Sequence, residues 1–282
     1  MAGRPRLGEL LLGTQGLALM RLAYSGDEAG RQACVDGMRA LLGRYDEDSG
    51  LLAPLPGSER DLDEGYALWS QTYDAPLRLF GLEEPVMHTL FDGLSAGSKV
   101  LDAACGTGRL ALQLTARGHN LTGVDRSPHM LARARTKLPD AVFLDGDLEA
   151  LPVPDAAFDA VVCGLALVHL PSLDQVMAEF ARVLRPGGRL IVSDVHPMPI
   201  LVGWQAQFRG ADGEAAFMRL HPHLLSDYAT AALDVGLRVA ACMEPLLTPE
   251  SVVTPAAEHV PEANRAAWVG MPGVVVWQFD KA

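Results

Sequence analysis

The stretch that decides the fold is Val100–Leu110, VLDAACGTGRL, in which an apolar run passes into a glycine-containing turn and then into a helical pattern. A turn this tight at the carboxyl end of a strand requires residues without bulky side chains, so that the backbone can approach a ligand closely. Gly106 and Gly108 meet this requirement. Such a turn is weak evidence by itself, because a tight strand-to-helix turn also occurs without a ligand.

Short β-branched or aliphatic runs alternate with helical patterns on both sides of this turn. They predict strands at 99–103, 120–124, 141–145, 158–165, 188–194, 237–243 and 274–279, with helices at 174–184 and 226–235. The first of these helices is expected to end at RPGG (185–188), immediately before the next strand. This alternation is typical of a parallel sheet covered on both faces. We therefore predict an α/β protein with a Rossmann-like, seven-stranded, mostly parallel sheet and helices on both faces.

The rest of the chain adds to this sheet. Residues 1–65 are predicted to form an N-terminal helical extension and linker, because apolar residues recur at helical spacing before an acidic run rich in Gly and Pro. Residues 66–282 form the main domain in this prediction. The alternation stops after Asp194, which predicts a cap insert over about 196–226. The apolar faces of the extension could cover the active site or form a homodimer.

Composition excludes several classes of partner. The chain has 282 residues, of which 49% are hydrophobic, so it can bury a large core. A net charge of −12 gives no basic footprint for nucleic acid. The four cysteines lack metal-ligand spacing, and the leucine-rich 7–22 stretch is too short and interrupted to span a bilayer. We expect a cytoplasmic protein with no metal, no membrane contact and no nucleic-acid partner.

Two carboxylates follow the next two strands. Asp125 ends the second strand, where it could accept both hydroxyl protons of an adenosine ribose. Asp147 and the backbone of Leu148 follow the third strand, where they could meet an adenine ring. Each has an ordinary alternative: Asp125 could cap the next helix, and Asp147 could belong to an acidic turn. The succession of glycine, acid and acid at three strand ends is harder to obtain by accident than any one of them.

With these residues in place, the sequence resembles the class I S-adenosylmethionine-dependent methyltransferases, particularly the small-molecule branch that includes ubiquinone- and menaquinone-type enzymes. The resemblance covers about 66–194. It implies S-adenosyl-L-methionine as cofactor and transfer of its methyl group to an O, N or C atom of a small, apolar or aromatic metabolite, as in secondary metabolism. Ala104 replaces the usual first glycine of the loop, a small departure because alanine still permits close approach.

The resemblance also assigns the residues around the cofactor. Asp102 would help to hold the ammonium group of the cofactor, and Gly106 and Gly108 would line its methionine part. The predicted cofactor contacts are Tyr73, Asp102, Ala104, Gly106, Gly108, Asp125, Arg126, Met130, Asp147, Leu148 and Cys163.

Two other functions fit parts of the pattern. A nicotinamide-dependent oxidoreductase would use the same loop, since Gly106, Gly108 and Ala111 satisfy a dinucleotide fingerprint. Asp102 argues against it, because a carboxylate suits an ammonium group better than a neighbouring pyrophosphate. The second alternative is a non-catalytic cofactor-binding module, which would lack an open acceptor cavity.

The reacting end is less well defined by the sequence. Tyr73 is the preferred aromatic contact of the sulfonium, with Trp69 and Tyr66 behind it, although Trp69 could equally be core. His169 and His196 follow the fourth and fifth strands and are candidates for a base or an acceptor-positioning group, or for structural hydrogen bonds. The predicted catalytic residues are His196, Tyr73 and His169, and the predicted acceptor contacts are Trp69, His196, His221, His223 and Tyr228.

Overall fold

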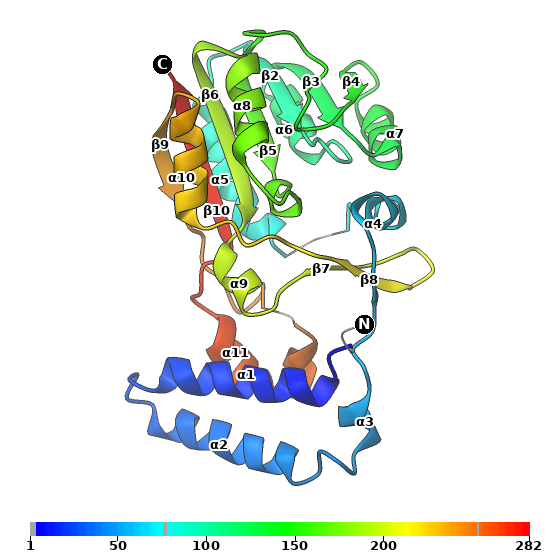
Figure 1. Ribbon diagram of the computed structural model, residues 1–282, viewed down its shortest axis with the longest axis vertical. Coiled ribbons are helices and arrows are strands. Elements are labelled where there is room, and N and C mark those ends of the chain that lie inside the picture. The colour runs from blue at the N-terminus through cyan, green and yellow to red at the C-terminus, as the bar shows by residue number, and fades with distance from the viewer. Residues whose placement is uncertain (1–3, 76–77, 253) are drawn as a thin grey trace. The chain divides into compact units, whose positions relative to one another are not determined.

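The computed structural model describes residues 4–75, 78–252 and 254–282. The chain divides into two compact units, one of Met1–Pro56 with Leu246–Met271 and one of Gly57–Pro245 with Pro272–Ala282. The larger unit contains the sheet predicted from the sequence, and the smaller unit is helical (Figure 1).

The larger unit is built on a seven-stranded sheet in the order β4-β3-β2-β5-β6-β10-β9. Its strands are β2 (Lys99–Ala103), β3 (Asn120–Asp125), β4 (Val142–Asp145), β5 (Phe158–Gly164), β6 (Leu184–Val195), β9 (Leu237–Met243) and β10 (Val274–Lys281). Strands β2 to β6 pair in parallel, whereas β10 runs antiparallel to both β6 and β9. The predicted fold class is confirmed.

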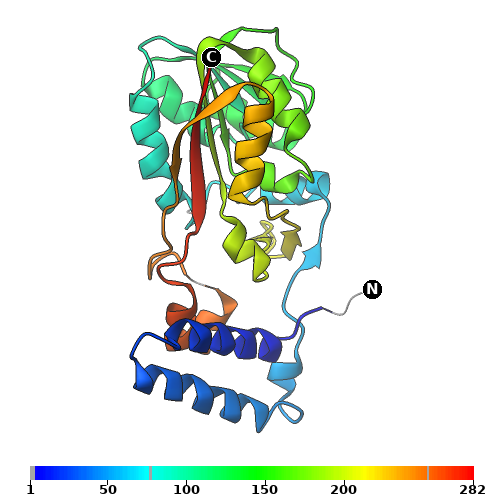
Figure 2. The same cartoon turned by 60° about the vertical axis from the view of Figure 1, so that its left-hand side comes forward.

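Helices cover both faces of this sheet, as the two views in Figures 1 and 2 show. They are α5 (Phe80–Asp92), α6 (Arg109–Ala116), α7 (Pro128–Lys137), α8 (Asp174–Val183) and α10 (Leu225–Asp234). Val161 of β5 packs in one core cluster with Phe180 of α8 and Tyr228 of α10. Its neighbour Val162 packs in another cluster with Phe91 of α5. Consecutive residues of the strand are thus buried on opposite faces, which explains its uninterrupted apolar sequence.

The segment RPGG differs from its prediction. We expect a turn between a helix and a strand, but β6 begins at Leu184, so that Arg185–Gly188 lies inside the strand. Phe158 of β5 is opposite Leu184, and Ala160 is opposite Arg189, so the intervening residues of β6 form a bulge. The first glycine of the segment has a φ of 75°, a conformation that glycine adopts without steric cost. Helix-stop residues therefore serve here as a bulge within a strand.

A second, smaller sheet and one helix form a part of the larger unit that we call the lid. It comprises α4 (Leu62–Trp69) and the strands β1 (Ser58–Glu59), β7 (Ala206–Arg209) and β8 (Ala215–Met218), in the sheet order β1-β8-β7. Helix α4 lies very close to β8, because a Cβ added to Gly65 would be 2.3 Å from Sδ of Met218. Strands β7 and β8 belong to the predicted cap insert, which also contains α9 (Pro197–Leu201).

The smaller unit is formed by two segments that are far apart in the sequence, Met1–Pro56 and Leu246–Met271. Its elements are α1 (Leu7–Leu22), α2 (Glu28–Leu42), α3 (Ser49–Leu52), η2 (Pro255–Glu258) and α11 (Pro261–Trp268). Leu11 of α1 and Ala256 of η2 are buried in one cluster, and Arg21 donates hydrogen bonds of 2.9 Å to the carbonyls of Ala267 and Val269. The predicted extension 1–65 thus differs from the observed unit, which stops at Pro56 and recruits the excursion between β9 and β10.

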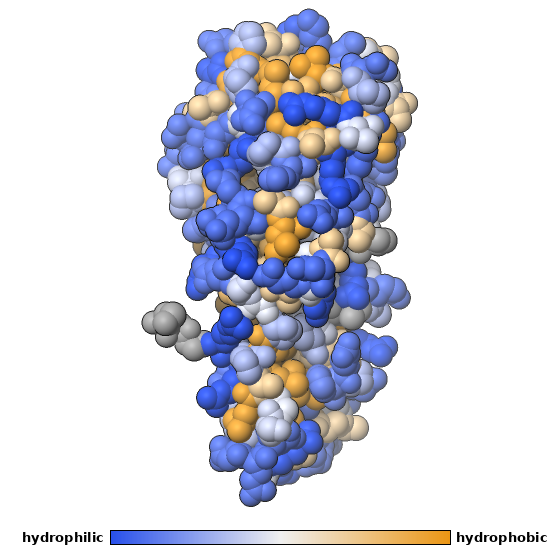
Figure 3. Space-filling model, turned by 90° about the vertical axis from the view of Figure 1, so that its right-hand side faces the viewer, coloured by the Kyte–Doolittle hydropathy of each residue, from blue (hydrophilic) through white to orange (hydrophobic). Residues whose placement is uncertain are grey.

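Polar side chains dominate the surface shown in Figure 3, in keeping with the net charge of −12. Within the described ranges of the chain, none of the helices combines the length and the apolar character that a membrane crossing requires.

Candidate active site

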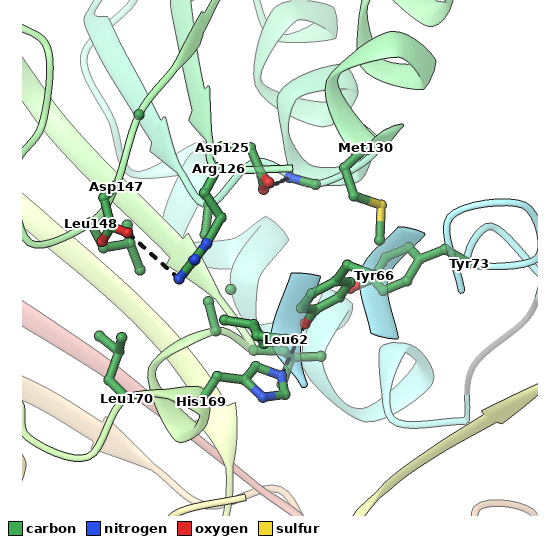
Figure 4. Close-up of a pocket in the computed structure, with 16 residues that line it drawn as sticks. Leu62, Tyr66, Tyr73, Asp125, Arg126, Met130, Asp147, Leu148, His169 and Leu170 are labelled. Atoms are coloured by element: carbon green, nitrogen blue, oxygen red, sulfur yellow. Dashed lines mark hydrogen bonds and ion pairs between the residues drawn. The ribbon is translucent and has the colours of Figure 1, made fainter. Parts of the chain in front are cut away.

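A cavity lies at the carboxyl edge of the parallel strands, beside α4 (Figure 4). The empty space within it and at its open mouth is about 660 Å³. It is lined by Leu62, Tyr66, Tyr73, Ala104, Gly106, Asp125, Arg126, Met130, Gly146, Asp147, Leu148, Gly164, Leu165, Ala166, His169 and Leu170. Most residues predicted to contact the cofactor are in this set.

The glycine turn after β2 forms one wall of the cavity. Ala104, Gly106 and Gly108 all have positive φ, at 57°, 53° and 82°. A Cβ on Gly106 would meet no atom within 4 Å, so this glycine leaves open space at the cavity wall. A Cβ on Gly108 would lie 3.3 Å from Cβ of Ala134, so Gly108 permits the approach of α7 instead. The two glycines therefore have different roles, one toward the cavity and one in packing.

Asp125 ends β3 and faces the same cavity. Its Oδ2 accepts a hydrogen bond of 2.8 Å from the backbone N–H of Gly106, and its Oδ1 accepts one of 2.8 Å from that of Ser127. Burial raises the pKa of this carboxyl group, and the two backbone donors oppose the rise. The alternative that Asp125 caps the next helix is wrong, because Ser127 is the N-cap of α7 and its hydroxyl accepts the hydrogen bond from the backbone N–H of Met130. Each carboxylate oxygen nevertheless has a further lone pair for a ligand hydroxyl.

The next strand contributes Asp147 and Leu148, as its place in a parallel sheet predicts. Strands β3 and β4 pair in register, with Asp125 opposite Asp145, so the residues after both strands meet at one edge. Arg126 and Met130, from the turn into α7 and its first turn, line the cavity beside them. Figure 4 shows Arg126 extending toward Asp147, with its NH1 atom 3.6 Å from Oδ2 of that residue.

Asp102 lies behind the glycine turn and does not line the cavity. Its side chain is buried, and burial raises its pKa to about 7. Among the described residues, its Oδ2 has no hydrogen-bond partner. An unpartnered buried carboxylate beside an open glycine wall suits a ligand that carries an ammonium group. The residues present therefore fit S-adenosyl-L-methionine.

An ion pair joins α6 to α5 next to the cavity. The NH2 atom of Arg109, the first residue of α6, lies 2.6 Å from Oε2 of Glu83, which is buried on α5. The hydroxyl of Ser193 on β6 donates a hydrogen bond to the other oxygen of Glu83. A Cβ on the cavity residue Gly164 would lie 3.0 Å from that same oxygen, so the network reaches the cavity wall.

Cys163 is the predicted cofactor contact that lies furthest into the core. It has no exposed surface and packs in the cluster beneath α8, and burial raises the pKa of its thiol. The next residue, Gly164, lines the cavity in its place.

Tyr66 and His169 form a pair that the sequence does not predict. Oη of Tyr66 on α4 lies 2.9 Å from Nε2 of His169, which belongs to the short helix η1 (Leu167–His169) after β5. Burial lowers the pKa of His169 to about 4 and raises that of Tyr66, so both groups are neutral at neutral pH. Both residues line the cavity, and they place one tyrosine hydroxyl and one neutral imidazole at its wall.

Tyr73 also lines the cavity, but Trp69 does not. Burial raises the pKa of Tyr73 to about 12, so its ring stays neutral. Trp69 stacks on Phe208 of β7, with ring centroids 4.8 Å apart, and lies edge-on to Tyr73 at 4.9 Å. It joins α4 to the lid sheet, which agrees with the alternative of core packing left open by the sequence.

The histidines of the cap insert do not line this cavity. His196 is buried, with Nδ1 accepting a hydrogen bond from the backbone N–H of Met198 and Nε2 2.9 Å from Oε1 of Glu244. His223 is buried with Nε2 2.9 Å from the carbonyl oxygen of Leu170, whereas His221 is exposed. The side-chain hydrogen bonds of His196 and His223 join the cap to Glu244 and to Leu170.

Tyr228 is part of the core. It has no exposed surface, and its hydroxyl donates a hydrogen bond of 2.8 Å to Oδ2 of Asp194 at the end of β6. Burial raises the pKa of Asp194 to about 7. The predicted acceptor surface of His196, His221, His223 and Tyr228 is therefore not assembled around this cavity.

A parallel sheet that ends in an antiparallel strand, with a glycine turn after its first strand and acids after the next two, defines the fold of class I methyltransferases. A family described as a methyltransferase domain matches residues 101–192. The chain is 21% identical to an S-adenosylmethionine-dependent methyltransferase from Mesorhizobium loti, with a TM-score of 0.55 over 71% of this chain and 98% of that one. The predicted resemblance is confirmed.

Curated relatives match in the same region. A demethylmenaquinone methyltransferase from Thermus thermophilus is 43% identical over 110 residues, which cover 37% of this chain and 50% of the relative. A malonyl-[acyl-carrier protein] O-methyltransferase from Pectobacterium atrosepticum is 34% identical over 137 residues, 48% of this chain and 53% of the relative. The chain thus spans about half the length of these relatives. The comparisons support S-adenosyl-L-methionine as the cofactor.

Proposed function

We propose that this protein transfers the methyl group of S-adenosyl-L-methionine to a small, apolar or aromatic molecule. One observation carries the proposal: a single cavity joins the glycine turn and two strand-end carboxylates to an acceptor end lined by tyrosine and histidine. A non-catalytic module would need only the first half. The fit to S-adenosylmethionine, including the buried Asp102 with its unpartnered Oδ2, favours it over a nicotinamide cofactor.

Each residue of the cofactor half has a defined task in this proposal. Asp125 accepts hydrogen bonds from the ribose hydroxyls, and Asp147 with the backbone of Leu148 meets the adenine ring. Asp102 balances the ammonium charge behind the glycine turn. When bound, the cofactor supplies an electrophilic methyl group for an in-line displacement. Positioning the acceptor for such a displacement can contribute roughly 7 kcal/mol or more.

The acceptor half holds the methyl acceptor and orients its reacting atom. Tyr73 and the apolar residues Leu62, Leu165 and Leu170 exclude water from the reacting atoms. Tyr66 donates its hydroxyl hydrogen to Nε2 of neutral His169, which leaves a lone pair of Oη for an acceptor O–H or N–H group. Since the pKa of His169 is about 4, it is a weak base, and its task is to fix the Tyr66 hydroxyl that orients the acceptor. Such positioning contributes on the order of a hundredfold.

Transfer of a labelled methyl group tests the proposal. The full chain is incubated with methyl-labelled S-adenosylmethionine and a panel of phenols, alcohols, amines and carbon acids on apolar frames. We expect at least one acceptor class to gain the label. The Tyr66→Phe and His169→Gln variants should each lose about a hundredfold in kcat with little change in cofactor KM.

Tyr24→Phe is the matched control, because Tyr24 is fully exposed in the smaller unit and should leave turnover unchanged. His196→Ala should lower stability without a comparable loss of turnover, since His196 does not line the cavity. No labelled product from the whole panel, in a protein that also fails to bind S-adenosylhomocysteine, would overturn the proposal.

A further inference from the structure

Among the charged residues that line the cavity, Arg126 has no task in the proposed chemistry. It follows the ribose-binding Asp125 directly and lines the cavity, with its side chain 45% exposed. Its guanidinium group contacts carboxylates from two other elements. It therefore links parts of the larger unit that are distant in the sequence.

The stronger of these contacts reaches the lid. Nε of Arg126 lies 3.1 Å from Oδ1 of Asp63 on α4, and NH2 donates a hydrogen bond of 3.2 Å to Oδ2 of the same residue. The two contacts are parallel, a geometry that a guanidinium group adopts with one carboxylate and that a lysine cannot reproduce. The second partner, Asp147, is the proposed adenine contact, at 3.6 Å. Arg126 thus joins the lid helix to the adenosyl half of the cavity.

Helix α4 covers part of this cavity. Leu62 and Tyr66, on either side of Asp63 in the sequence, line it. The same helix packs on the lid sheet through the close approach of Gly65 to Met218. Further along the chain, Arg133 and Lys137 of α7 contact the carbonyl oxygen of Gln71 and the carboxylate of Asp74. Polar contacts with the start of α7 and with α7 itself therefore fasten the whole segment that covers the cavity.

These contacts are exposed, and their strength is correspondingly small. Asp63 is 68% exposed and Arg126 45% exposed, so water and salt screen the pair. Exposed ion pairs contribute at most a few-fold to an equilibrium constant. A contact of this strength can open during each turnover, so it suits control of ligand exchange and not the stability of the fold.

We propose that Arg126 is a positioning residue that fastens α4 over the adenosyl site, so that its bond to Asp63 slows the release of S-adenosylmethionine and of the demethylated product. The inference rests on the proposed function, because it requires an adenosyl ligand in this cavity. It adds a task for two residues, Arg126 and Asp63, that catalysis itself does not require.

Release of S-adenosylhomocysteine measures the effect, by stopped-flow dilution of the complex into excess unlabelled competitor. We expect Asp63→Asn and Arg126→Gln each to speed release about threefold to fivefold. The double variant should release no faster than Arg126→Gln, because both changes break one contact. The Arg126→Lys variant should release S-adenosylhomocysteine faster than the wild type but more slowly than Arg126→Gln.

Two controls separate this role from a general effect of charge. Glu64→Gln removes the neighbouring carboxylate of α4, whose pairing with Arg60 does not involve cavity residues, and should leave release unchanged. Raising NaCl from 0.05 M to 0.5 M should speed release from the wild type and hardly affect Asp63→Asn.

The outcomes distinguish this inference from the proposed function. Failure of the wild type to bind S-adenosylhomocysteine would overturn both. Normal binding with the same release rate in Asp63→Asn, or additive effects in the double variant, would overturn only the role of Arg126.

Discussion

The two sides of the cavity are built from different kinds of sequence. The strand-edge side, made of Ala104, Gly106, Asp125, Asp147 and Leu148, follows three consecutive strands of one parallel sheet. The covering side combines α4 with η1, and its key contact joins Tyr66 to His169 across 103 positions of the chain. Local motifs thus specify the strand-edge side, where we propose that the cofactor binds, whereas long-range packing specifies the covering side.

This difference has a functional consequence. The backbone of the strand-edge side is fixed by buried strands and by hydrogen bonds such as that from Gly106 to Asp125. The covering side is held by aromatic stacking and exposed ion pairs, as at Trp69 on Phe208 and Arg126 on Asp63. Changes on the first side should therefore abolish cofactor binding, and changes on the second should alter exchange and turnover.

Filling the open space at the glycine wall should have the largest effect. We expect Gly106→Val to weaken S-adenosylhomocysteine binding roughly hundredfold or more, because its side chain enters the space left for the ligand. Gly118→Val is the matched control, since Gly118 also has positive φ and open space but lies at the opposite edge of the sheet. Equal losses in both variants would mean that backbone strain, and not the cavity, explains the result.

The second-largest effect is expected from neutralising Asp125, the carboxylate proposed to bind the ribose. Asp125→Asn should weaken binding of S-adenosylhomocysteine about 10-fold to 100-fold, because charge-assisted hydrogen bonds are lost while the shape is kept. Asp145→Asn, on the neighbouring strand and outside the cavity lining, should bind normally in the same calorimetric titration. If the two variants bind alike, the sheet edge does not hold the ribose.

The buried carboxylate behind the turn should show itself in the pH dependence of stability. The pKa of Asp102 is about 7 in the folded protein and close to 4 in an unfolded chain, so the folded state binds more protons between these values. This residue's contribution to the free energy of unfolding is therefore lost as pH rises from about 4 to about 7. Asp194 acts in the same direction.

Asp102→Asn should flatten this decline by on the order of 1 kcal/mol between pH 5 and pH 7, measured by urea unfolding of the ligand-free protein. If the free energy of unfolding of Asp102→Asn falls with pH as steeply as that of the wild type, the pKa of Asp102 is not raised in the folded protein.

The smallest effect concerns Ala104, which has a φ of 57° where the resembling family carries glycine. Ala104→Gly should raise the free energy of unfolding by less than about 1 kcal/mol, because relief of backbone strain exceeds the entropic cost of glycine only slightly. Ala103→Gly, in the buried strand just before it, should destabilise the protein by about 1 kcal/mol. Thermal melts of the two variants should therefore move in opposite directions.

The sequence was informative wherever short-range pattern and sheet geometry determine the structure. Apolar runs gave the bounds of β2 and β9 correctly, and strand ends placed Asp125 and Asp147 at one edge. The sequence pattern does not predict contacts between residues that are far apart in the chain. His196, next to a strand end, pairs with Glu244 instead of opening into the cavity. Helix α8 ends before RPGG as predicted, but the place of RPGG inside β6 was missed because its bulge depends on pairing with β5.

The domain organisation shows the same limit. Nothing local in 246–271 indicates that it packs with α1, since that contact joins segments from opposite ends of the chain. The pairing of Tyr66 with His169 likewise arises only when α4 and η1 are both in place.

The most direct measurement is a calorimetric titration of the full chain with S-adenosylhomocysteine and, separately, with NAD⁺. The account predicts saturable binding of one S-adenosylhomocysteine per chain, lost in Gly106→Val and kept in Gly118→Val, and no binding of NAD⁺. Tight binding of NAD⁺ with none of S-adenosylhomocysteine would contradict it.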